Sequence, residues 1–95
     1  MATKKRKDSI VDKIMKDITI ERDNDRYNYW QVKYKGVVVD EYDTDAVIEN
    51  YLDGEEKPED WEIENAIKID FEDRIEKAFN TGGELAVKRL LLPFE

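Results

Sequence analysis

The stretch YNYWQVKYKGVVVDEY, residues 27–42, decides the fold. It holds five of the ten aromatic residues of the chain. Polar and apolar positions alternate in its first half, so that Trp30 and Tyr34 share one face, as in a strand with one buried side. Lys35-Gly36 suits a two-residue turn because glycine readily adopts a positive φ. The stretch therefore predicts a β-hairpin, with strands at about residues 26–34 and 37–42.

A further strand is predicted before the hairpin. Residues 17–23 place Ile18 and Ile20 on one face and polar side chains on the other. Asn24-Asp25 suits the turn into the hairpin, because both residue types tolerate the left-handed conformation. The three strands would form an antiparallel meander, which needs a helix against one face to be stable.

Helices are predicted on both sides of the meander. Ser9 begins a short N-terminal helix, with Asp12 completing a capping box and an apolar stripe following. After the third strand, Asp43 or Thr44 caps a helix that ends at Gly54.

A longer helix is predicted to start at Pro58, which suits the first helical position. Its apolar residues recur about every four positions as far as Phe79. Residues 66–71 also alternate as in a strand, but the length of the stripe favours a helix. Residues 80–83, Asn-Thr-Gly-Gly, predict its end, and residues 84–92 predict a last short helix before a proline.

These elements predict an α+β fold in one domain, residues 9–95, preceded by a flexible basic tail at residues 1–8. The three-stranded antiparallel meander would carry the N-terminal helix and two to three C-terminal helices on one face. We expect Trp30, Tyr34 and Tyr51 in the core and leave Tyr29 and Trp61 open. The run Lys4–Lys7 in the tail has two interpretations, a solubilising end or a nuclear-import or polyanion-binding patch.

The composition argues against an enzyme. The chain has no histidine and no cysteine, which removes the usual general base and the usual zinc ligands. Ser9 is the only serine, Gly82-Gly83 lacks a phosphate-loop pattern, and Asp43-x-Asp45 lacks the central glycine of a calcium loop. We therefore expect no catalytic residue, no metal site and no cofactor.

No apolar run approaches the ~20 residues needed to span a membrane, and no hydrophobic segment follows the basic start. The absence of cysteine fits a reducing compartment, so we expect a cytoplasmic protein.

The charge is high and unevenly distributed. The formal net charge is −8; residues 1–35 hold ten basic and six acidic side chains, whereas residues 36–95 hold six basic and eighteen acidic ones. Twelve carboxylates crowd into residues 40–64, where Lys57 is the only cation. This distribution disfavours nucleic acid and anionic membranes as direct partners, because phosphate binding requires positive charge. It favours a basic partner.

Pairing along a helix explains only some of the acids. The pairs Glu64–Lys68, Asp70–Arg74 and Asp73–Lys77 have i, i+4 spacing, each worth ~0.2–0.5 kcal/mol. Residues 40–62 have no such explanation. Neighbouring acids on helices and strands lie ~5–7 Å apart, close to the phosphate spacing along one DNA strand. The hypothesis is an acidic surface that mimics DNA, made of Asp40, Glu41, Asp43, Asp45, Glu49, Asp53, Glu55, Glu56, Glu59 and Asp60.

The order of elements resembles that of small phage-encoded anti-CRISPR proteins that block Cas9 by mimicking DNA. The resemblance is carried by the helix at residues 9–16, by the meander ITIERDNDRYNYWQVKYKGVVVDEY and by DTDAVIENYLDGEE, about half of the chain. It implies an inhibitor in a bacterial host cell, acting on the basic nucleic-acid-binding cleft of a protein such as a host defence nuclease.

Two other interpretations stay open. The apolar segment at residues 85–94 could dock an adaptor or subunit onto a partner, or form a homodimer, and deleting Leu90–Phe94 would then abolish assembly but leave the fold. Alternatively, the acidity could serve solubility alone.

Overall fold

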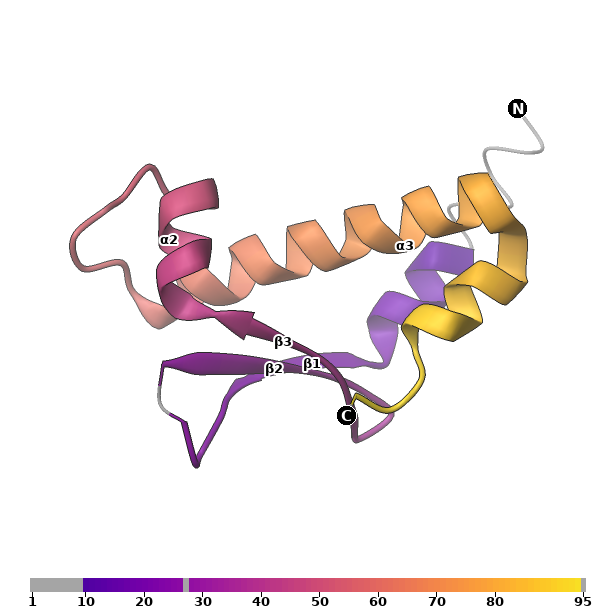
Figure 1. The fold of residues 1–95 in the computed structure, drawn as a ribbon, viewed down its shortest axis with the longest axis horizontal. Coiled ribbons are helices and arrows are strands. Elements are labelled where there is room, and N and C mark those ends of the chain that lie inside the picture. Colours follow the sequence, from indigo (N-terminus) through magenta and orange to yellow (C-terminus); the bar gives the residue numbers. More distant parts are fainter. Residues whose placement is uncertain (1–9, 27, 95) are drawn as a thin grey trace.

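A three-stranded antiparallel sheet lies beneath one long helix (Figure 1). The computed structural model describes residues 10–26 and 28–94. The expectations for the tail, for the Ser9 cap and for Tyr27 lie outside these residues.

The elements are a helix over residues 10–16, β1 (Ile18–Arg22), β2 (Tyr29–Tyr34), β3 (Val37–Asp43), α2 (Thr44–Tyr51) and α3 (Asp60–Leu90). The predicted α+β class, with its meander and its flanking helices, is confirmed.

The strand order is β1-β2-β3, with Ile20 opposite Val32 and Val32 opposite Asp40. The predicted turn between β2 and β3 is present: Lys35 and Gly36 have φ values of 51° and 83°. Positive φ at both central positions is typical of the hairpin turn whose twist matches the strands. A register shift after Val32 adds one residue to β3, a bulge that the sequence analysis did not predict.

The connection between β1 and β2 is longer than the predicted two-residue turn. The Asp23 carboxylate accepts hydrogen bonds from the backbone N–H groups of Asp25 at 2.8 Å and Arg26 at 3.3 Å. The first of these bonds lowers the pKa of Asp23. Because the side chain holds this loop, β2 begins at Tyr29 rather than at residue 26.

Helix α3 starts two residues later than expected. Asp60, not Pro58, is its first residue, and Glu59 is the cap; the Glu62 carboxylate accepts a hydrogen bond from the Glu59 N–H at 2.8 Å. Residues 66–71 are helical, as favoured: Ile67 is fully buried and Ile69 is 59% exposed. The predicted break at residues 80–83 is present: Gly83 has non-helical φ and ψ, and the predicted last helix follows it as far as Leu90, so that α3 is two helices joined by a kink.

The core lies between the sheet and the underside of α3, where Ile63, Ile67, Phe71 and Ile75 are buried. Trp30 is buried near the start of β2, as predicted, and Tyr34 packs against the core while partly exposed. The prediction for Tyr51 is wrong, because its side chain is 47% exposed at the end of α2.

The kink places the last helical turns of the chain back on the body of the protein. In Figure 1 the part of α3 after Gly83 turns back under the first part of the same helix, beside the helix of residues 10–16. Val87 is buried, Leu90 and Leu91 pack against the core, and the Phe94 N–H donates to the Val38 carbonyl at 2.8 Å. Deleting Leu90–Phe94 would therefore remove packing contacts, contrary to the expectation that it would leave the fold intact.

Candidate acidic interface

The ten carboxylates predicted to bind a partner fall into three groups. Three of them form ion pairs with arginines, two lie at helix starts, and five are at or near the surface without an ion pair among the described residues. They are respectively Asp40, Glu41 and Asp60; Asp43 and Glu59; and Asp45, Glu49, Asp53, Glu55 and Glu56.

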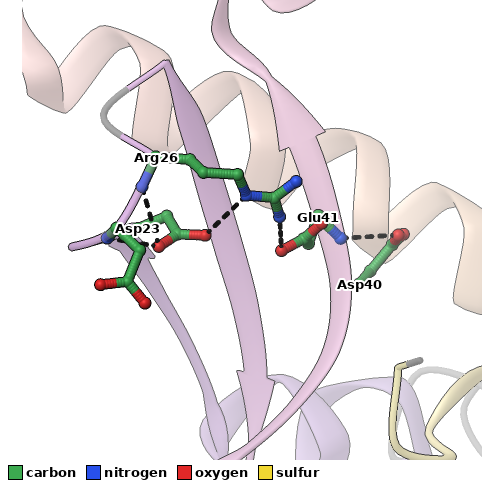
Figure 2. A network of polar contacts seen from close by, with 5 residues as sticks. Asp23, Arg26, Asp40 and Glu41 are labelled. Carbon is green, nitrogen blue, oxygen red and sulfur yellow. Dashed lines mark hydrogen bonds and ion pairs between the residues drawn. The ribbon is translucent and has the colours of Figure 1, made fainter.

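The first group is largely neutralised. Figure 2 shows the Arg26 guanidinium between the carboxylates of Asp23 and Glu41, reaching from the loop after β1 across β2 to β3. The hydrogen bond that the Arg26 guanidinium donates to Glu41 raises the pKa of Arg26. Asp40 pairs with Arg74 of α3, and its other oxygen accepts the Glu41 N–H at 2.8 Å.

Asp60 pairs with Arg22 of β1 at 2.7 Å. Two of the three arginines in these pairs, Arg22 and Arg26, come from the basic N-terminal third of the chain. Arginines thus balance Asp40, Glu41 and Asp60 within the anionic surface that the sequence predicted.

The two acids at helix starts, Asp43 and Glu59, accept hydrogen bonds from N–H groups in the first turns of their helices. Asp43 accepts the Asp45 N–H at 2.9 Å and caps α2, as predicted. Asn28 Nδ2 lies 3.4 Å from the carboxylates of Asp43 and Asp45. Glu59 accepts a hydrogen bond from Trp61 Nε1 at 2.5 Å. The donors to these carboxylates are neutral groups, and none of the carboxylates forms an ion pair among the described residues.

Of the remaining acids, Asp45 lies in the first turn of α2, and the other four lie in the second half of α2 or in its connection to α3. In Figure 1 this connection projects at one end of the molecule, opposite the kink of α3. We call the following six residues the acidic end: Glu49, Asp53, Glu55, Glu56, Glu59 and Glu62. The pKa of Glu55 is raised by partial desolvation and by the negative charges of Glu62 and Glu59. The shift shows that carboxylates are crowded here, with Lys57 the one cation in the connection.

Sequence reasoning missed Glu62 as a member of this group. Its carboxylate reaches back to the Glu59 N–H because α3 begins at Asp60, which turns Glu62 toward the connection. The signal was the spacing Glu59-x-x-Glu62, which follows a capping-box pattern with an acid at the cap position.

Of the three predicted i, i+4 pairs, only Asp73–Lys77 forms, at 3.0 Å. Arg74 pairs with Asp40, and Asp70 accepts hydrogen bonds from two tyrosine hydroxyls. Glu64 and Lys68, which both lie in the described part of the chain, form no ion pair. Partners distant in sequence compete successfully with the local ones.

Asp70 links the acid-bearing helix α2 to the rest of the fold. It accepts hydrogen bonds from the Tyr42 hydroxyl of β3, at 2.5 Å, and from the Tyr51 hydroxyl of α2. Arg74 Nη1 lies 3.2 Å from the same Tyr42 oxygen. The ring of Tyr51 is half exposed, but its hydroxyl holds the end of α2, and with it the acidic end, in position against α3.

The hydrogen bonds from Tyr42 and Tyr51 to Asp70 predict a loss of stability at alkaline pH. Desolvation, followed by the hydrogen bond to Asp70, raises the pKa of Tyr42, and the same carboxylate raises the pKa of Tyr51. The unfolded chain ionises its tyrosines near pH 10, while the folded chain keeps both protons. The stabilisation is therefore complete below about pH 10 and is lost progressively above it.

Urea unfolding from about pH 8 to about pH 11 should show this decline. The double variant Tyr42→Phe, Tyr51→Phe lacks both groups and should lose stability less steeply over the same range. Equal slopes for the two proteins would contradict the assignment.

Comparisons with known proteins assign no family to this chain. No protein-family model, curated protein or solved structure matches the chain. Within residues 10–26 and 28–94, no cluster of three or more His, Cys, Asp or Glu side chains could hold a metal ion. In the same residues, no helix combines the length and the apolar character needed to cross a membrane.

Proposed function

We propose that this chain is a non-enzymatic binding protein whose acidic end enters the basic groove of a nucleic-acid-binding protein in place of DNA. A host defence nuclease in a bacterial cytoplasm is the kind of partner that the resemblance implies. The proposal rests on one observation: the carboxylates of the acidic end have no ion pair among the described residues, although arginines neutralise Asp40, Glu41 and Asp60 elsewhere in the fold.

The physical argument is that crowded carboxylates repel one another in the folded chain, and that binding a basic partner relieves this repulsion. Desolvation and the negative charges of Glu62 and Glu59 raise the pKa of Glu55, so that ionising this carboxyl carries a cost in the folded chain. A groove lined by Lys and Arg would relieve this repulsion and would accelerate the encounter by electrostatic attraction. The position at one end of the molecule, away from the sheet, lets the acids enter a groove without the rest of the fold following.

The test neutralises four acids that take part in no cap. The variant Glu49→Gln, Asp53→Asn, Glu55→Gln, Glu56→Gln is compared with Asp12→Asn, Asp17→Asn, Asp25→Asn, Glu84→Gln, which changes the net charge equally at exposed positions elsewhere. The immobilised protein is exposed to bacterial lysate at low salt, and bound proteins are eluted with duplex DNA.

We expect the first variant to bind the eluted protein at least about tenfold more weakly, ~1.4 kcal/mol, and the control to bind nearly as well as the parent. The affinity of the parent should fall between about 50 mM and about 300 mM salt. Affinity that does not depend on salt, or an equal loss in both variants, would remove the basis for DNA mimicry and leave solubility as the role of the acids.

A second candidate function has one observation in its favour. Leu85, Leu92 and Phe94 of the C-terminal segment are 63%, 60% and 48% exposed. Such a group could dock an adaptor partner or a second copy of the chain. The neighbouring Val87, Leu90 and Leu91 are already used by the fold, so the available apolar surface is smaller than the sequence suggested.

A further inference from the structure

The two edge strands of the sheet, β1 and β3, differ in what lies against them. At β3, the C-terminal residues lie against the edge, and the Phe94 N–H bonds to the Val38 carbonyl. At β1, a groove of about 570 Å³ separates the edge strand from α3. Residues 18–20 line one side of this groove, and Trp61, Glu64, Asn65 and Lys68 line the other. The helix therefore overhangs a sheet edge that has room for another strand.

The backbone of β1 is oriented to accept that strand. The Asp17 carbonyl accepts the Lys35 N–H at 3.1 Å, and the Asp23 N–H donates to the Tyr29 carbonyl at 2.9 Å, so the odd-numbered residues bond to β2. Because an antiparallel strand alternates its hydrogen-bonding direction, Ile18 and Ile20 direct their N–H and C=O groups to the open edge. The sequence Ile-Thr-Ile here has high strand propensity and carries no proline or lysine that would discourage pairing.

Trp61 gives the groove a preference for positive charge. Its side chain is 63% exposed, and the hydrogen bond from its Nε1 to Glu59 orients the ring. Glu64 lies one turn further along α3, on the same wall. An exposed indole face beside carboxylates is suited to hold a Lys or Arg side chain. Lys68, at the next turn of that wall, disfavours a second cation at that point.

We propose that an extended basic segment of a partner protein adds to β1 as a fourth strand, with one Lys or Arg side chain over Trp61 and beside Glu64. The net charge of −8 favours this occupant over a second copy of the chain, because two copies repel each other. The inference goes beyond the proposed function, since the groove lies along the sheet edge and shares no lining residue with the acidic end; Trp61 touches that end only through its hydrogen bond to Glu59.

The test uses synthetic peptides of about ten residues, a usual upper length for a strand. One alternates lysine with valine, a second has the same sequence with every backbone nitrogen methylated, and a third replaces lysine by glutamate. The methylated peptide keeps the charge but cannot pair with a strand edge. Binding is measured by calorimetry, and protection of the Ile18 and Ile20 amides by hydrogen exchange in the full chain.

We expect the lysine peptide to protect both amides, and the methylated and glutamate peptides to bind at least about tenfold more weakly. Trp61→Ala should weaken the lysine peptide about tenfold, with Trp61→Phe intermediate. The variant neutralised at residues 49, 53, 55 and 56 should bind the lysine peptide within about threefold of the parent, which separates this site from the acidic end.

Three results would overturn the proposal. Equal binding of the methylated peptide would reduce the effect to general attraction between opposite charges. Protection of Ile18 and Ile20 in the free monomer would show that the chain itself covers the edge. Protection that rises with protein concentration, together with a dimer in sedimentation, would identify a second copy as the occupant.

Discussion

Replacing Ile67 by alanine is expected to lower the free energy of unfolding by about 2–5 kcal/mol. The Ile67 side chain is fully buried on the side of α3 that faces the sheet, and it is among the largest buried side chains of the core. Its truncation leaves a cavity between α3 and the sheet. A domain of this size has a total stability of only about 5–15 kcal/mol. The variant should therefore unfold at a much lower urea concentration than the parent.

The matched control lies two residues away on the same helix. Ile69 is 59% exposed, so Ile69→Ala should change the free energy of unfolding by no more than about 0.5 kcal/mol. The pair also tests the element itself. In a strand, residues 67 and 69 would share a face and the two substitutions would cost the same, whereas the helix predicts a large difference.

Gly83→Ala is expected to cost about 1–3 kcal/mol. Gly83 has φ 67° and ψ −157°, a conformation that is almost restricted to glycine. An added Cβ would meet no atom within 4 Å, so the cost is conformational and not a clash. If the alanine instead straightened α3, Val87 would lose its place in the core, which is also unfavourable.

Urea unfolding of Gly83→Ala, with Glu84→Ala as the control, measures this cost. Glu84 is exposed and helical, and its replacement should leave the stability nearly unchanged. Equal midpoints for the two variants would mean that the kink is not required. Hydrogen exchange at Val87 should be faster in Gly83→Ala alone.

The candidate site was only partly predictable. The concentration of acids in residues 40–64 is a property of the sequence, but the choice of which acids are paired is not. Arg22 reaches Asp60 because β1 lies beside α3, and Arg26 reaches Glu41 across β2 from the loop after β1. Nothing in the local sequence places these arginines near those carboxylates. The partner of the acidic end stays a prediction.

The sequence by itself determined the local structure. Alternation specified the strands, Lys35-Gly36 specified the hairpin turn, Asp43 specified the start of α2, and the apolar stripe specified α3. These features depend on residues within one or two turns of each other, so their physical causes can be recognised in a short stretch of sequence.

Only the tertiary structure decided which charges remain available. The bulge after Val32 and the arrangement of Asp70 with Tyr42 and Tyr51 depend on contacts between distant segments. An ion pair forms with whichever opposite charge the packing brings within reach, and local spacing adds only a few tenths of a kcal/mol. Packing therefore neutralised Asp40, Glu41 and Asp60, and it left the acidic end and the groove beside Trp61 open.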